Sequence, residues 1–201
     1  IYAENPVLGA VDAMGNVELY LSQWSPGVLT QTEAFNVAGN LSIDSRKSTY
    51  FNYQNVKLTH ADNWLGGQLE LRVGDADIAV ASDLDLATIS TLSSNDGSST
   101  GQLKLSSAGN ITANGSKVLS ANQFLSAAGD LLLDNVSLSS ANLSGRNITI
   151  TNSQFVDLLG LEATGDLKIN AQSIFSDGAI SVAGTTDLTG RVELNHVDNE
   201  F

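Results

Sequence analysis

The chain repeats one short phrase, in which glycine is followed by asparagine or aspartate and then by an apolar–any–apolar triplet. From the third copy onward the Asn or Asp falls at positions 110, 130, 147, 166 and 187, so that copies are 20, 17, 19 and 21 residues apart. A turn signal and a short strand that recur about every twenty residues are typical of a β-solenoid, in which each repeat forms one coil. The copies begin at Gly15, Gly39, Gly109, Gly129, Gly145, Gly165 and Gly184, and the copy at Gly145 carries one inserted residue.

Within each repeat the apolar and polar residues alternate, so the period is two rather than 3.6. Leu131 and Leu133 point to one side of a strand and Leu132 to the other. Turn residues follow each other too closely for a helix of ten residues. We therefore predict an all-β parallel β-helix of about 20 residues per coil, with apolar ladders inside. Asn and Asp at its corners are expected to bond to the backbone of neighbouring turns.

The spacing of the phrase divides the chain into two parts of one continuous solenoid. In residues 1–100 the copies at Gly15, Gly39 and Gly67 are 24 and 28 residues apart, and a polar loop at residues 93–100 precedes a further match at Gly101. Longer intervals indicate insertions, which lie on the surface of solenoids. We expect residues 1–100 to form irregular coils with a recognition region, and residues 101–201 to form regular coils.

Aromatic residues are concentrated in the irregular part and are the candidate partner-binding residues. Exposed aromatic side chains beside polar groups are typical anchors for proteins or sugars. The alternative is that they pack the insertions onto the rod. By contrast, the later phenylalanines are spaced like occasional core residues, namely Phe124, Phe155, Phe175 and Phe201. The candidate anchors are Trp24, Tyr50, Phe51, Tyr53 and Trp64.

Acidic residues cluster once, at Asp75, Asp77, Asp83 and Asp85. If stacking brought these carboxylates together, they would supply enough oxygen ligands for Ca²⁺. Solvating or structural aspartates are the alternative. A catalytic role as in β-helical polysaccharide lyases would need an arginine or lysine beside the carboxylates, and Arg72 is the one candidate. We expect no metal and no cofactor.

Composition restricts the function further. The net charge of −13 and the scattered acidic residues argue against nucleic acid and anionic membranes as partners. No apolar run is long enough for a transmembrane helix, so we expect no membrane insertion. There is no cysteine, and the two histidines, His60 and His196, are expected on surface loops. No known catalytic motif accompanies them.

Three runs resemble the repeats of filamentous-haemagglutinin-type proteins. These are Ala108–Ala113, Ala127–Leu133 and Ala163–Ala171. The resemblance is good over residues 100–195 and loose over 10–100. It implies a right-handed β-helix, export by two-partner secretion, and a role as an adhesin or as the stalk of a contact-dependent growth-inhibition toxin. The amino-terminal secretion domain of that family and a toxin-like carboxyl end are absent from this sequence.

Together these observations predict a non-enzymatic extracellular stalk or adhesin fragment, secreted or on a bacterial cell surface and expected to be monomeric. Its partner would be a cell-surface receptor on a target bacterium or host cell, namely an outer-membrane protein, a glycan or lipopolysaccharide. Two alternatives stay open. One is a β-helical carbohydrate-active enzyme or a phage tail-fibre fragment acting on polysaccharide. The other is a purely structural stalk segment without a ligand, which burial of the five aromatic residues would favour.

Overall fold

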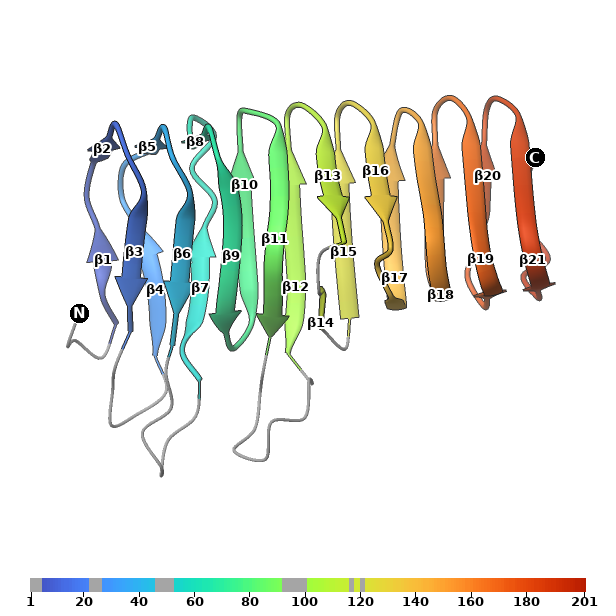
Figure 1. The fold of residues 1–201 in the computed structure, drawn as a ribbon, viewed down its shortest axis with the longest axis horizontal. Helices are drawn as coiled ribbons and strands as arrows, with labels where there is room; N and C mark the ends of the chain where they lie inside the picture. The colour runs from blue at the N-terminus through green and yellow to red at the C-terminus, as the bar shows by residue number, and fades with distance from the viewer. Residues whose placement is uncertain (1–4, 22–26, 46–52, 92–100, 116–117, 120–121) are drawn as a thin grey trace.

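The fold is a parallel β-helix in which successive coils stack along one axis (Figure 1). The structure is a computed structural model that describes residues 5–21, 27–45, 53–91, 101–115, 118–119 and 122–201. From the N-terminal to the C-terminal side, the chain rises on the rear of the rod and descends on the front, which is a right-handed winding (Figure 1). The predicted all-β fold is therefore confirmed. No helix long and apolar enough to cross a membrane occurs in the described part of the chain.

Two long faces make up most of the rod, and every strand pairs in parallel with the equivalent strand of the next coil. Face I contains β1 (Val7–Leu8), β4 (Val28–Gln31), β7 (Asn55–Leu58), β10 (Ala76–Val80), β12 (Gln102–Ser107), β15 (Asn122–Ala127), β17 (Leu138–Gly145) and β20 (Ile180–Val182). Face II contains β3 (Val17–Tyr20), β6 (Leu41–Asp44), β9 (Gln68–Val73), β11 (Leu84–Thr91), β13 (Ile111–Asn114), β14 (Val118–Leu119), β16 (Leu131–Asp134), β19 (Leu167–Ser176) and β21 (Thr186–Leu194). Strand β18 (Ile148–Ala163) turns a corner: its first part pairs with β16 and β19, and its last part with β17 and β20.

Among the described residues, a third, short face forms a separate three-stranded sheet in the first three coils. It consists of β2 (Val11–Ala13), β5 (Phe35–Val37) and β8 (Trp64–Leu65). The side chain of Asn63, which is fully buried, ends this face. Its Oδ1 accepts hydrogen bonds from Gln31 Nε2 and Phe35 N, and its Nδ2 donates to Gln31 Oε1 and to the carbonyls of Leu58 and Ala79. Asn63 thereby satisfies backbone groups of consecutive coils where the cross-section changes from three faces to two.

The core is one continuous set of apolar ladders that follows from the alternation in the sequence. On face II, Ile111, Leu131, Ile148 and Leu167 stack in register and are all buried. Identical positions in neighbouring coils lie about 4.8 Å apart, the spacing of paired strands. Each coil therefore buries its apolar row only against its neighbours, and stability is shared along the axis.

The glycine–asparagine phrase is a hydrogen-bonded ladder between coils. In each case Oδ1 of the Asn or Asp accepts the backbone N–H of the equivalent residue one coil later, as Asn110 does from Asp130 at 2.8 Å. Glycine precedes that residue because a Cβ there would overlap the same Oδ1; for Gly129 the atom overlapped is Oδ1 of Asn110. The expectation that corner Asn and Asp bond to neighbouring turns is thus confirmed. The bonds, at 2.7 to 3.2 Å, join Asn16 to Asn40, Asn40 to Gln68, Asp83 to Asn110, Asn110 to Asp130, Asp130 to Asn147, Asn147 to Asp166, and Asp166 to Thr185.

The copies of the phrase at Gly145 and Gly184 stack differently from the sequence prediction. Arg146, not Gly145, occupies the glycine position. The hydrogen bond from the N–H of Arg146 to the carbonyl of Gly129 shows this stacking. Thr185, not Asp187, occupies the final Asn/Asp position, since Gly184 stacks on Gly165 and Leu167 pairs with Thr186. The last step is therefore 19 residues, and the predicted step of 21 is wrong.

The match at Gly101 does not belong to the face II ladder. It lies on face I, where Leu103 pairs with Ala76 and the N–H of Gln102 donates to Oδ1 of Asp75. Asp75 in turn donates its N–H to Oδ1 of Asn55. A second, shorter ladder therefore runs along face I. On face II, Gln68 pairs with Asp85, so the ladder resumes at Asp83 two residues out of step with Gln68.

Candidate binding surface

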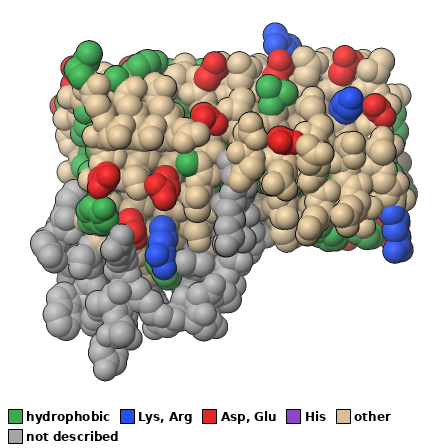
Figure 2. Space-filling view, viewed as in Figure 1, with side chains coloured by type: hydrophobic (Ala, Val, Ile, Leu, Met, Phe, Trp, Pro, Cys, Tyr) green, Lys and Arg blue, Asp and Glu red, His purple; other side chains and the backbone are tan. Residues whose placement is uncertain are grey.

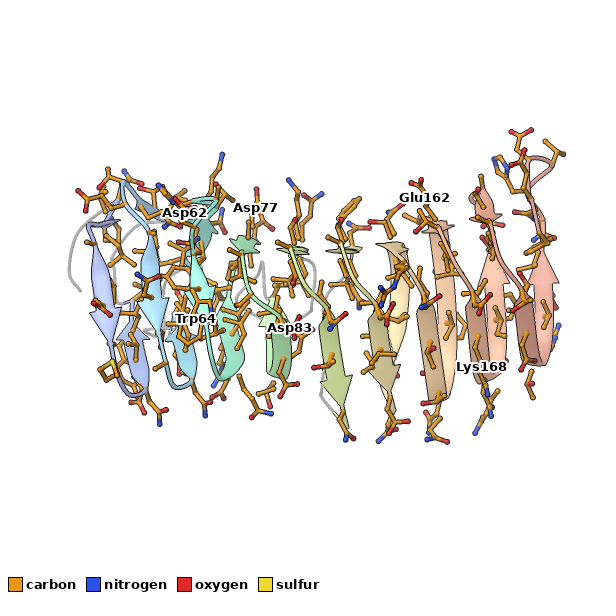
Figure 3. All side chains as sticks on the ribbon, turned by 90° about the horizontal axis from the view of Figure 1, so that it is seen from above. Asp62, Trp64, Asp77, Asp83, Glu162 and Lys168 are labelled. Atoms are coloured by element: carbon orange, nitrogen blue, oxygen red, sulfur yellow. The ribbon has the colours of Figure 1, made fainter. Side chains whose placement is uncertain are left out.

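Of the five candidate aromatic anchors, the structure describes two. Trp24, Tyr50 and Phe51 lie outside the described residues. Tyr53 is 8% exposed and therefore buried. Trp64 lies on β8 and is 43% exposed, pointing out from the short third face (Figure 3). Only Trp64 of the described pair is available to a partner.

The four aspartates of the acidic cluster are not brought together. Asp77 lies on β10 of face I and Asp85 on β11 of face II, and Asp75 and Asp83 lie in the turns before these two strands. Figure 3 shows Asp77 and Asp83 at separate places on the rod. Asp75 and Asp83 each accept a backbone N–H of the next coil, and Asp77 lies 3.6 Å from Nζ of Lys104. Oδ1 of Asp85 accepts a hydrogen bond from the hydroxyl of Thr112. Within the described residues no group of three or more carboxylate or histidine side chains is placed to hold a metal ion.

The two histidines occupy equivalent local turns. Nδ1 of His60 accepts the N–H of Asp62, and Nδ1 of His196 accepts the N–H of Asp198, each at 3.2 Å. Both bonds lie at the surface. Each imidazole therefore caps its own turn.

Three aspartates of the regular coils have lowered pKa values because of hydrogen bonds between coils. The Arg146 guanidinium, which donates Nε and Nη2 to Asp130 at 2.9 Å each, is the main cause for Asp130. The hydroxyl of Thr151 lowers the pKa of Asp134, and the N–H and hydroxyl of Thr185 lower that of Asp166. These carboxylates are held in the charged form as parts of the scaffold.

The outer surface of face I carries a groove of about 440 Å³ across four coils. Two outward columns form it. In the first, Lys104, Phe124, Asn142 and Gly160 follow each other in register. In the second, the corresponding residues are Ser106, Ser126, Ser144 and Glu162.

The groove exists because small side chains stand between larger ones. Gly160 has no side chain, and a Cβ there would come within 3.1 Å of Oδ1 of Asn142. The hydroxyl of Ser144 donates to that of Ser126 at 2.9 Å, which keeps both side chains low on the sheet. Phe124 is 38% exposed and stands above them at one side. Glu162 projects from the same side of the rod as Asp77, and Lys168 projects from the opposite side (Figure 3).

Phe124 corrects the expectation that the later phenylalanines belong to the core. Phe124, Phe155 and Phe201 are exposed, and only Phe175, which is half-buried, approaches the expected environment. The rings of Phe155 and Phe175 pack against each other at 5.4 Å between centroids. The alternation contained the signal: Leu125 and Ala127 point inward, so Phe124 between Gln123 and Leu125 must point outward.

Face II offers a second hollow of about 400 Å³ around Leu132, between Thr112 and Thr149 and beside Asp85 and Asp134. None of the described residues that line it is aromatic. On the side of the rod seen in Figure 2, acidic side chains are scattered and hydrophobic ones are isolated. The groove on face I is therefore the best candidate binding site among the described residues.

A family model described as repeats of unknown function (DUF5649) matches residues 3–72 and 145–201, well over half of the chain. The two matched stretches correspond to the first three coils and to the last coils of the rod. Comparisons with curated proteins and with solved structures found no match.

Proposed function

The chain belongs to the family of repeats of unknown function DUF5649, and we propose that it is a non-enzymatic extracellular stalk that presents a binding surface to a receptor on another cell. The resemblance of the runs at Gly109, Gly129 and Gly165 to filamentous-haemagglutinin-type repeats supports a place on a bacterial surface or in a secreted protein. A toxin stalk and an adhesin are both consistent with this proposal.

The scaffold supports the mechanical part of the proposal. Apolar ladders and the bonds from Asn and Asp continue through the coils, so each coil holds its neighbours in place. Nine strand positions of face II at about 4.8 Å give a rod of roughly 40 Å. Such a rod holds a surface at a fixed distance and orientation.

The groove beside Phe124 is the observation that carries the binding part. Its volume lies within the range of small-ligand sites, about 300–1,000 Å³. An exposed aromatic ring stands beside hydroxyl and amide groups there, and a parallel sheet holds all of them in fixed positions. We propose this groove as the contact surface, in place of the aromatic cluster of the first coils.

The test is binding of the fluorescently labelled chain to intact candidate target cells, measured by flow cytometry. We expect the wild-type chain to bind and Phe124→Ala to lose most of the binding. Phe155→Ala is the matched control, because it removes another exposed phenylalanine that lies outside the groove. Equal binding by wild type and Phe124→Ala would refute the assignment of the groove, and loss in Trp64→Ala instead would favour the third face.

A carbohydrate-active enzyme is the alternative. Glu162 in the groove would be its candidate catalytic carboxylate. Hydrolysis of a glycosidic bond by the usual mechanism requires two carboxylates about 5 to 10 Å apart. Glu162 is the only carboxylate among the described residues that line the groove. Release of reducing ends from a polysaccharide by the wild-type chain, abolished in Glu162→Gln, would establish this alternative in place of the stalk.

A further inference from the structure

From the chemistry of the face I groove we infer that its ligand is a neutral oligosaccharide. The inference rests on the proposed function, since it names the receptor chemistry at the same site. It depends on three properties of the described residues, namely shape, hydrogen-bonding groups and charge.

The shape fits an elongated, low-profile ligand. The groove runs along the rod axis through four coils, a length of about 14 Å at about 4.8 Å per coil. The ring of Phe124 forms one wall, and the bare backbone at Gly160 leaves the groove shallow before Ala179, which lines its far end. A short saccharide chain laid along the axis would place one sugar against Phe124 and further sugars over Asn142 and Gly160.

The hydrogen-bonding groups fit a polyhydroxylated ligand. Each serine hydroxyl offers a donor and acceptor positions, and the Asn142 amide offers both kinds of group. Since Ser126 and Ser144 are already bonded to each other, they are fixed in position before a ligand arrives. Sugar hydroxyls can both donate and accept, so they match such a row. The apolar C–H face of a pyranose would pack on the exposed ring of Phe124.

The charges favour a neutral ligand over an acidic one. Lys104 lies at one end of the groove, but Asp77 is 3.6 Å from its ammonium group. Glu162 lies at the other end and is exposed. The lining thus has no excess positive charge, and the chain as a whole carries a net charge of −13. Uronates, sialylated glycans and phosphorylated lipopolysaccharide cores would be repelled.

A protein partner fits the groove less well. Protein interfaces usually bury about 800 Å² on each partner around a core enriched in aromatic residues, methionine and arginine. Phe124 is the one aromatic residue in the lining that the structure describes, and serine, asparagine and glycine surround it. The groove has the size and polarity of a site for a small polar ligand.

The experiment is a printed array of neutral and acidic oligosaccharides, probed with the whole chain and four variants. We expect binding to a class of neutral oligosaccharides. Phe124→Ala should weaken it about tenfold, because an aromatic contact contributes up to about 1.5 kcal/mol beyond area burial. Phe124→Trp should retain binding, and Gly160→Gln, which fills the groove, should lose it. Phe155→Ala should bind like the wild type. Circular dichroism of each variant verifies that the fold is intact.

Treatment of the target cells separates this inference from the proposed function. Cell binding that depends on Phe124 and is abolished by periodate oxidation of glycans, but not by protease, is the expected result. Cell binding that depends on Phe124 but is abolished by protease and resists periodate would overturn the glycan and leave the stalk proposal standing. Array binding restricted to acidic oligosaccharides, or equal binding by wild type and Gly160→Gln, would also overturn the inference. Absence of any cell binding would overturn the proposed function itself.

Discussion

Replacing Gly129 by alanine tests whether the glycine of each phrase exists to admit the side chain of the preceding coil. A Cβ at position 129 would overlap Oδ1 of Asn110 and lie 3.1 Å from the backbone of Gly109. The Asn110 side chain must move away, which leaves the N–H of Asp130 without its 2.8 Å partner. Leaving a partly buried backbone donor unsatisfied costs about 1–3 kcal/mol, so we expect a loss of about 2 kcal/mol in the free energy of unfolding.

Gly145→Ala is the matched control, because Gly145 begins the next copy of the phrase. The nearest atoms to a Cβ at position 145 are 3.4 to 3.5 Å away, which is ordinary van der Waals contact. The backbone there does not need glycine, so alanine is expected to be neutral or to stabilise by up to about 1 kcal/mol through the unfolded state. The sequence phrase treats the two glycines alike, whereas the structure separates them.

The assay is equilibrium unfolding in guanidinium chloride followed by far-ultraviolet circular dichroism. A double-mutant cycle with Asn110→Ala sharpens it. Once the Asn110 side chain is gone, Gly129→Ala has nothing to overlap except the backbone of Gly109, so its further cost should fall to about 0.5 kcal/mol or less. Equal losses for Gly129→Ala and Gly145→Ala, or full additivity in the cycle, would refute the ladder as the reason for the glycine.

Two further predictions concern the scaffold. The lowered pKa of Asp166 means that its contribution to stability is present above the ordinary carboxyl range and is lost as the pH falls through the folded-state pKa. Asp166→Asn keeps an acceptor for the N–H of Thr185 but does not titrate. The denaturant midpoint of this variant should therefore drop less than that of the wild type between about pH 5 and about pH 2. An equal drop of the midpoint in the two proteins would disprove this. Asn63→Ala leaves the N–H of Phe35 and two backbone carbonyls without their partner and should lower the free energy of unfolding by about 3 kcal/mol. The control Asn36→Ala, on the exposed side of β5, should change it by less than about 0.5 kcal/mol. Similar values for both variants in denaturant unfolding would show that Asn63 does not join the coils.

The sequence predicts the solenoid because its coil-to-coil contacts repeat. Alternation places Leu131 and Leu133 inward and the phrase marks each turn, so every coil predicts the same strand and the same turn. What the phrase does not reveal is which residue stacks on which. Arg146 takes a glycine position because its guanidinium can bind Asp130, and Thr185 takes an Asn position because its N–H and hydroxyl both donate to Asp166. These choices depend on contacts with the preceding coil.

The candidate site was the harder part to predict. Aromatic residues are concentrated in the first part of the sequence, but Tyr53 there is buried. Phe124 stands out only when the alternation of its own strand is combined with its neighbours one coil before and after, Lys104 and Asn142. The groove also depends on the small residues beside the ring of Phe124. One of them, Gly160, is 36 residues further along the chain, so the sequence does not show that the two are neighbours.

The most direct test of the proposed binding surface is hydrogen–deuterium exchange of the chain with and without the oligosaccharide that it selects from the array. We predict slower exchange in peptides covering β15, β17 and the last part of β18, which carry the groove, and unchanged exchange in β19 and β21 on face II. Protection confined to β7 and β8 around Trp64, or to face II, would contradict the assignment of binding to the Phe124 groove.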